Sequence, residues 1–149
     1  MGPLDPERER QLAKDLFNHV WTLLDSERRT RAEDDEMIHA AHASRHHWAV
    51  VGEPVNLARG EWQCSRVYAA LGRSEPALWH GRRCLDICEE HAIGDFDLAY
   101  ALEAIARAYR VAGELPEAEA YARLAADAAE RIADAEDRKH FERDLATLA

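Results

Sequence analysis

The chain has 149 residues, of which 47% are hydrophobic, and its 29 acidic and 19 basic residues give a net charge of −10. This length fits one domain with a core of several helices, and the acidic balance disfavours a nucleic-acid binder, which needs clustered Lys and Arg. No apolar run approaches the roughly 20 residues that span a membrane, and residues 1–6 lack the pattern of a signal peptide. We therefore expect a cytoplasmic protein that binds neither nucleic acid nor a membrane, with its three cysteines kept as thiols.

Apolar residues recur with the helical period along the whole chain. In the first such stretch, Leu12, Leu16, Val20 and Leu23 follow one another at intervals of three or four residues. Strand-like alternation is absent, and the strong helix formers Ala, Leu, Glu and Arg dominate. The sequence therefore predicts an all-α fold with about seven helices, over residues 7–24, 31–51, 54–71, 75–91, 95–112, 116–133 and 135–148.

Turn and cap residues divide these helices. Gly52 and Pro54 should end the second helix, Asp95 is the expected N-cap of the fifth, and Pro116 fits the first turn of the sixth. Small residues in the fourth helix form a row that would let a neighbouring backbone come close. These residues are Ala77, Gly81, Cys84 and Cys88.

Two stretches of the chain repeat each other at an offset of 41 residues, which places Gly72 on Gly113. The other matching pairs are Tyr68 with Tyr109, Ala77 with Ala118, and Arg66 with Arg107. A helix that ends at Gly and is soon followed by another helix is typical of an αα-hairpin. We therefore expect a single domain over residues 1–149, with hairpin repeats at 54–91 and 95–133, a helix pair at 7–51 and a capping helix at 135–148.

The stretches 68–77 and 109–118 resemble the tetratricopeptide repeat. That family has an aromatic residue late in its first helix, Gly at the turn, Ala early in the second helix, and a small residue seven positions later. The small residue is Cys84 in one copy and Ala125 in the other. The offset of 41 exceeds the usual period of about 34. The resemblance implies a short right-handed superhelix of stacked hairpins.

The resemblance also implies a concave groove that is lined by the first helix of each pair and binds a protein or peptide. The residues expected to line it are Asn56, Arg59, Trp62, Arg66, Tyr100, Glu103 and Arg107. Arginine beside aromatic rings suits an acidic group or a C-terminal carboxylate, because guanidinium binds carboxylate through two hydrogen bonds. The alternative is that Glu103 pairs with Arg66 or Arg107 in a structural network.

Three histidines, His39, His42 and His46, share one side of the second helix, opposite its apolar stripe. Imidazoles at this spacing can share a metal ion, and a solvated polar face explains them equally well. A third interpretation is that His42 and His46 extend the binding groove and titrate near neutral pH. On the fourth helix, His80, Cys84, Cys88 and His91 also share a face, although Cys84 fits a buried small-residue position better.

No motif for nucleophilic catalysis or phosphate binding is present in the sequence. The first functional hypothesis is therefore a scaffold module that binds a protein or peptide without chemistry or cofactor. The second is a metal-binding protein or metal-dependent enzyme that uses His39, His42 and His46. Self-association into a homodimer, through Trp48, Trp62 or Trp79, is a third hypothesis.

Overall fold

The computed structural model describes residues 2–149, which form seven α-helices and no strand. The all-α fold class and the number of helices are therefore confirmed for the described chain. The helices are α1 (Pro6–Leu24), α2 (Arg31–Val51), α3 (Pro54–Ala70), α4 (Ser74–Glu90), α5 (Asp95–Val111), α6 (Leu115–Ala129) and α7 (Ala135–Ala146). None of them combines the length and the apolar character that spanning a membrane requires.

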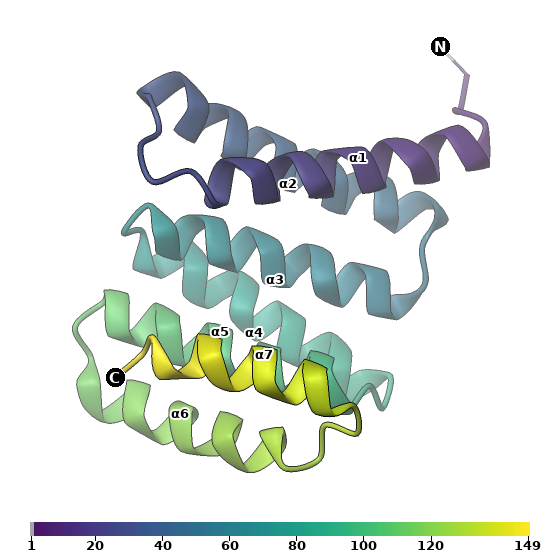
Figure 1. The fold of residues 1–149 in the computed structure, drawn as a ribbon. Coiled ribbons are helices and arrows are strands. Elements are labelled where there is room, and N and C mark those ends of the chain that lie inside the picture. Colours follow the sequence, from purple (N-terminus) through teal and green to yellow (C-terminus); the bar gives the residue numbers. More distant parts are fainter. Residues whose placement is uncertain (1) are drawn as a thin grey trace.

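The helices pack as hairpins that follow one another through the molecule. Figure 1 shows α1 and α2 at one end, α3 and α4 in the middle, and α5 and α6 at the other end, with α7 running across α5. Helix α3 contacts α1, α2, α4 and α5, so it ties the first hairpin to the rest. Helix α7 packs on α5 and α6. This packing is consistent with stacked hairpins.

The two glycine turns have the same geometry. Gly72 and Gly113 lie in the left-handed region, with φ of 73° and 79°. In each turn the residue after the glycine donates its backbone N–H to a tyrosine carbonyl five residues earlier, over 2.9 Å: Arg73 to Tyr68 and Glu114 to Tyr109. Glycine adopts this conformation without the steric cost that a Cβ would add. The predicted left-handed glycines are therefore confirmed.

The offset of 41 residues also holds in the structure. Helices α3 and α5 begin at Pro54 and Asp95, and α4 and α6 begin at Ser74 and Leu115. The internal packing of the hairpins agrees as well. The ring centroids of Tyr68 and His80 lie 5.7 Å apart, as do those of Tyr109 and Tyr121. Helix α7 begins at Ala135, 40 residues after α5, so it takes the place of a further first helix.

Some predicted helix ends are wrong. Helix α6 stops at Ala129 rather than near residue 133, because the next residues turn back with bonds between residues three apart, such as Ile132 N–H to the Ala129 carbonyl. The N-cap of α5 is Gly94 rather than Asp95, which is the first helical residue and has φ of 55°. The Asp95 carboxylate instead accepts the N–H of Phe96 and, at 3.1 Å, that of Ala133. Asp95 thereby ties the loop after α6 to the start of α5.

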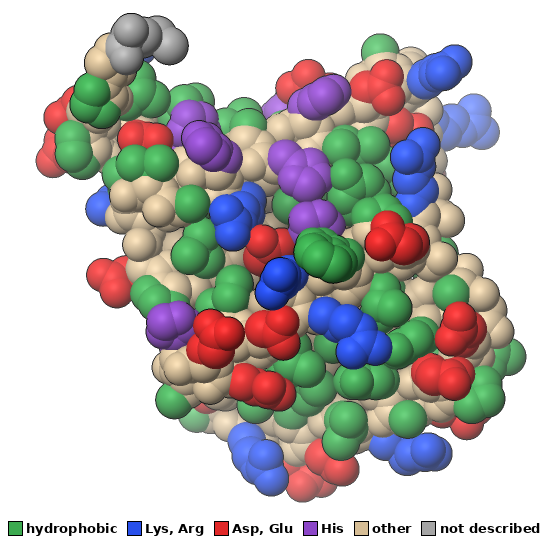
Figure 2. Space-filling view, turned by 180° about the vertical axis from the view of Figure 1, so that it is seen from behind, with side chains coloured by type: hydrophobic (Ala, Val, Ile, Leu, Met, Phe, Trp, Pro, Cys, Tyr) green, Lys and Arg blue, Asp and Glu red, His purple; other side chains and the backbone are tan. Residues whose placement is uncertain are grey.

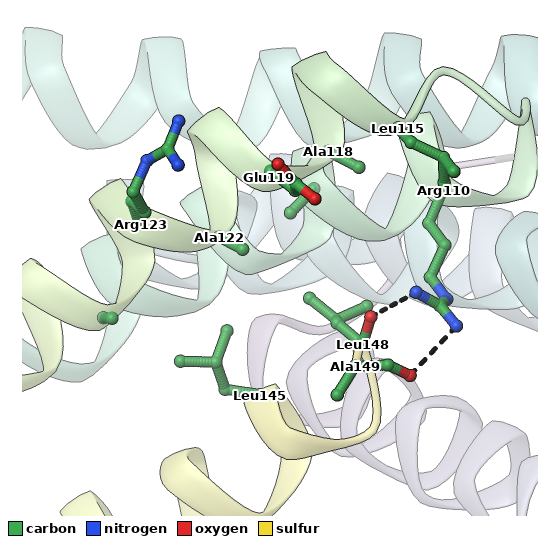
Figure 3. A pocket seen from close by; sticks show the side chains of 11 residues that line it. Arg110, Leu115, Ala118, Glu119, Ala122, Arg123, Leu145, Leu148 and Ala149 are labelled. Atoms are coloured by element: carbon green, nitrogen blue, oxygen red, sulfur yellow. Dashed lines mark hydrogen bonds between the residues drawn. The ribbon is translucent and has the colours of Figure 1, made fainter.

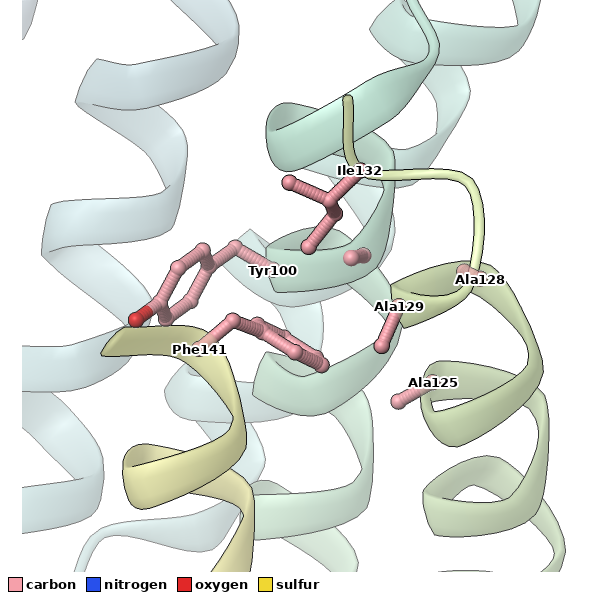
Figure 4. Packing of buried hydrophobic residues seen from close by; sticks show 7 residues of the cluster. Tyr100, Ala125, Ala128, Ala129, Ile132 and Phe141 are labelled. Carbon is pink, nitrogen blue, oxygen red and sulfur yellow. The ribbon is translucent and has the colours of Figure 1, made fainter. Parts of the chain in front are cut away.

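Small and aromatic residues fill the core. The predicted row of small residues on α4 is buried, and a Cβ on Gly81 would lie only 3.3 Å from both Ser65 Oγ and Ile105 Cγ1. Glycine is needed there because α4 lies so close to α3 and α5. At the other end, Figure 4 shows the Phe141 ring of α7 packed between Tyr100 of α5 and Ala129 of α6. This contact fixes α7 beside α5.

Candidate functional site

A groove with a cavity volume of about 620 Å³ lies between α1, α3, α5 and α7. Five aromatic side chains from three of these helices line it, so we call it the aromatic groove. They are Phe17 and Trp21 of α1, Trp62 of α3, and Phe96 and Tyr100 of α5. Its charged residues are Arg59 on α3, Asp95 and Asp97 on α5, and Asp137, His140 and Asp144 on α7.

The aromatic rings form one continuous series. Trp62 is central: its ring centroid lies 5.5 Å from that of Trp21, at an interplanar angle of 36°, and 5.4 Å from that of Tyr100, at 74°. The series continues from Tyr100 to Phe96 at 4.7 Å and from Trp21 to Phe17 at 6.5 Å. These separations are those of favourable edge-to-face and tilted pairs. The rings therefore hold one another in place as a wall.

The wall contains a polar group without a partner. The Trp62 Nε1–H is buried, and no atom of residues 2–149 accepts a hydrogen bond from it. A buried donor without an acceptor costs about 1–3 kcal/mol. Buried polar groups left in this state in a folded protein call for an explanation, and a bound group is one.

Arg59 is already paired at the edge of the groove. Its Nε and Nη2 donate to the two carboxylate oxygens of Asp97, at 2.9 and 3.2 Å. The hydrogen bond to Asp97 raises the pKa of Arg59, so the guanidinium stays charged. Asp144 accepts the Tyr100 hydroxyl at 2.6 Å, and burial together with this carboxylate raises the pKa of Tyr100. The phenol therefore stays protonated as a donor.

A buried ion network lies beside the groove and joins α3, α5 and α7. Glu103 is fully buried, and its Oε1 lies 2.6 Å from Arg107 Nη2 and 3.5 Å from Arg66 Nη1. Arg66 also approaches Asp144 at 4.0 Å, and Arg107 donates to the Thr147 hydroxyl at 2.7 Å. The alternative that Glu103 pairs with both arginines is confirmed. The structure therefore places Arg66, Glu103 and Arg107 in a structural network and not on the groove wall.

Burial dominates the electrostatics of Glu103. It raises the pKa of the Glu103 carboxyl, although the charges of Arg107 and Arg66 act in the opposite direction. One of its oxygens, Oε2, accepts no hydrogen bond within residues 2–149. The network therefore needs both arginines to keep the carboxylate charged.

Asn56 does not lie in the groove. Its Oδ1 accepts the backbone N–H of Glu53 at 2.9 Å, which closes the first turn of α3. The prediction that Asn56 is a binding residue is therefore not supported by its position. Of the residues predicted for the groove, Arg59, Trp62 and Tyr100 line it.

His42 and His46 lie away from the aromatic groove, so the prediction that they extend it is wrong. Figure 2 shows the opposite side of the molecule from Figure 1, with most of the visible histidine side chains in its upper half. The His42 side chain is half-buried rather than solvated, because it packs between α3 and α4. Its Nε2 lies 2.9 Å from the Tyr68 hydroxyl, and its ring centroid lies 5.2 Å from that of His80. His46 is exposed and packs against His47.

A buried carboxylate links this histidine cluster to α3. Glu61 accepts from Arg45 Nε at 2.9 Å and pairs with His80 Nδ1 at 2.6 Å. Burial alone would raise the pKa of Glu61, but the hydrogen bond with His80 and the charge of Arg45 outweigh it and lower the pKa. Burial, reinforced by His80, lowers the pKa of His42. The cluster thus favours an ionised Glu61 beside a neutral His42.

Residues 2–149 contain no group of three or more His, Cys, Asp and Glu side chains placed to hold a metal ion. In particular, His39, His42 and His46 do not form such a group. Cys64, Cys84 and Cys88 are buried free thiols, and burial raises the pKa of Cys64 to about 12. A protonated, buried thiol is a poor nucleophile.

Sequence reasoning missed the contributions of α1 and α7 to the groove. The offset of 41 could have found the first, because it connects Trp21 to Trp62, and the second, because it connects Tyr100 to Phe141. The acidic residues of α7 carried no distinguishing pattern and had been taken as part of a solvated exterior.

A second, smaller cavity of about 480 Å³ lies between α5, α6 and the end of the chain. Figure 3 shows Leu145 and Leu148 facing Ala118 and Ala122 of α6, with the Arg110 guanidinium donating to the carbonyls of Leu148 and Ala149. Alanine and leucine dominate its lining, so it offers few polar groups that could orient a ligand.

Comparison with known proteins finds no family model, no curated protein and no solved structure that matches this chain.

Proposed function

We propose that this chain is a tetratricopeptide-like module that binds an extended segment of a protein in the aromatic groove, without carrying out chemistry on it. The observation that carries this proposal is the convergence of α1, α3, α5 and α7 on one groove with an aromatic wall. Among the described helices these four hold the first-helix positions of the successive hairpins, which is where the family resemblance implies a binding groove.

The composition of the groove favours recognition. Aromatic side chains supply large contact area at low cost in conformational entropy, and they dominate the binding energy of protein interfaces. Trp21, Trp62 and Tyr100 hold one another at 5.4–5.5 Å, so little ordering remains to be done when a partner binds. A peptide carbonyl that reached the buried Trp62 N–H would also satisfy a donor that has no acceptor in the described chain.

The polar groups of the groove support binding over catalysis. Asp97 is occupied by Arg59, and Asp144 by the Tyr100 hydroxyl. Neither carboxylate is paired with a histidine and a nucleophile in the arrangement that acid–base or covalent catalysis needs. These fixed pairs instead present a constant pattern of charge to a partner.

The test is the replacement of a groove tryptophan with a matched control. A random library of fluorescent nonapeptides is screened against the protein, and the best binder is titrated by fluorescence anisotropy. Trp21→Ala should weaken binding at least about tenfold, because it removes a half-buried aromatic contact at the groove. Trp79→Ala removes an exposed tryptophan of α4 that does not line the groove, and it should leave affinity unchanged.

Urea unfolding of both variants separates loss of binding from loss of fold. Equal affinity for Trp21→Ala and the wild-type protein, or no peptide binder at all, would contradict the proposed function.

A further inference from the structure

We propose that the segment bound in the aromatic groove inserts a cationic side chain, arginine or lysine, against the aromatic wall. This inference rests on the peptide-binding function proposed above and names the chemistry of the partner. It differs from the acidic partner that the sequence led us to expect.

The charges that line the groove are mainly negative. Four aspartates line it against one arginine, and that arginine, Arg59, is neutralised by Asp97. Asp95 accepts only backbone N–H groups, which are neutral, so its charge is not cancelled by them. Asp144 has Arg66 at 4.0 Å and His140 at 3.8 Å. The groove therefore carries an excess of negative charge, in a chain whose net charge is already −10.

Asp137 is the carboxylate most available to a partner. It lies exposed in the first turn of α7, at the groove. Its backbone N–H caps the helix through Asp134, while its side chain makes no hydrogen bond or ion pair within residues 2–149. A cation beside it would gain a counter-charge without displacing an existing pair.

The aromatic wall complements these carboxylates. The face of an indole or phenol ring attracts a cation, by about 0.5–1 kcal/mol at exposed sites and about 2 kcal/mol when water is excluded. Trp21, Trp62 and Tyr100 supply such rings between the acidic residues of α5 and α7. Arginine suits this site because its guanidinium can stack on a ring and pair with a carboxylate simultaneously.

A carboxylate occupant finds fewer partners here. The guanidinium groups expected to bind it, those of Arg66 and Arg107, are committed to buried Glu103. Arg59 is committed to Asp97. Binding a carboxylate would require one of these pairs to break, next to three further aspartates. Charge complementarity therefore selects a basic segment.

Four nonapeptide libraries that differ only at the central position provide the test. That position is arginine, lysine, the neutral arginine isostere citrulline, or glutamate, with random neutral residues on either side. The arginine and lysine libraries should bind about tenfold more tightly than the citrulline library, and the glutamate library should bind most weakly.

Two charge-matched variants locate the cation. Asp137→Asn should weaken binding of the arginine library about threefold, because it removes the free carboxylate at the groove. Asp127→Asn makes the same change at an exposed position of α6 outside the groove, and it should have no effect. Both positions are exposed, so both variants should fold, which circular dichroism verifies.

The outcomes separate this inference from the proposed function. If all four libraries bind equally well, or the glutamate library binds best, the groove binds peptides and the cation proposal is overturned. Equal effects of Asp137→Asn and Asp127→Asn would also overturn it, because the cation would then lie elsewhere. If no library binds and light scattering shows a dimer, a second copy fills the groove, and both proposals fail.

Discussion

At the scale of single residues, Glu103 is the charge on which the junction of α3, α5 and α7 depends. It is fully buried, and two arginines from different helices converge on it. Removing one partner of a buried ion network costs far more than removing an exposed one, because the remaining charges keep no compensation. The network therefore acts as a structural joint beside the groove.

We predict that Glu103→Ala lowers the free energy of unfolding by about 3 kcal/mol or more, since it leaves Arg66 and Arg107 without their carboxylate. Arg59→Ala is the matched control, because Arg59 and Asp97 also pair across α3 and α5, but at the surface. It should cost less than about 1 kcal/mol. Urea unfolding measures both, and similar losses for the two variants would contradict a buried joint.

The pairing of Glu103 with arginine could be predicted from helical spacing, because Glu103 and Arg107 lie four residues apart on one helix. The part played by Asp144 could not. It comes from α7, and only the packing of Phe141 against Tyr100 brings that helix to the site. Periodicity within a helix gives its faces, but it does not give the partner that each face meets.

At the scale of elements, the glycine turns set the hairpins. Gly72 and Gly113 carry positive φ, and no atom lies within 4 Å of the place where a Cβ would be added. A substitution there is therefore opposed by backbone strain alone. The sequence predicted these turns correctly because the requirement is local: a left-handed residue after a helix favours glycine whatever surrounds it.

Gly113→Ala should lower the free energy of unfolding by about 1 kcal/mol, because alanine is strained at φ of 79°. Gly113→Asn should cost less, since asparagine tolerates this region better. Gly94 also has open space around a Cβ but has φ of −108°, so Gly94→Ala should cost nothing measurable. Chemical unfolding of the three variants checks the order, and an equal cost at positions 94 and 113 would refute it.

The contact between α2, α3 and α4 should weaken in mild acid. Burial and the charge of His80 lower the pKa of His42 below its ordinary 6.5. The unfolded chain then binds a proton at His42 more readily than the folded chain, so stability is complete above pH 6.5 and falls as the pH drops through the lowered value. The charged groups that act on His42 are His80, Glu61, His39 and Arg45.

His42→Gln should therefore reduce the loss of unfolding free energy between pH 7.5 and pH 5.5. His46→Gln removes an exposed histidine of the same helix and should behave like the wild-type protein. Parallel pH profiles for the wild-type protein and His42→Gln would show that this imidazole does not govern the junction.

At the scale of the whole molecule, the stacking of the hairpins creates the aromatic groove. No single helix carries it: α1 and α3 supply the tryptophans, α5 supplies Phe96 and Tyr100, and α7 supplies acidic residues. The sequence predicted stacked helices and three of the lining residues, Arg59, Trp62 and Tyr100. It could not predict which arginines stay free, because that depends on ion pairs between helices far apart in the chain.

The central claim is that a peptide segment occupies this groove, and the four tryptophans of the chain report on it directly. We would record the indole N–H signals by ¹H–¹⁵N NMR while titrating the best-binding nonapeptide. Trp21 and Trp62 line the groove, whereas Trp48 is buried in α2 and Trp79 is exposed on α4. We predict that the Trp21 and Trp62 signals shift while those of Trp48 and Trp79 stay in place. A shift at Trp79 alone, or no shift at Trp21 and Trp62 when the peptide is bound, would contradict it.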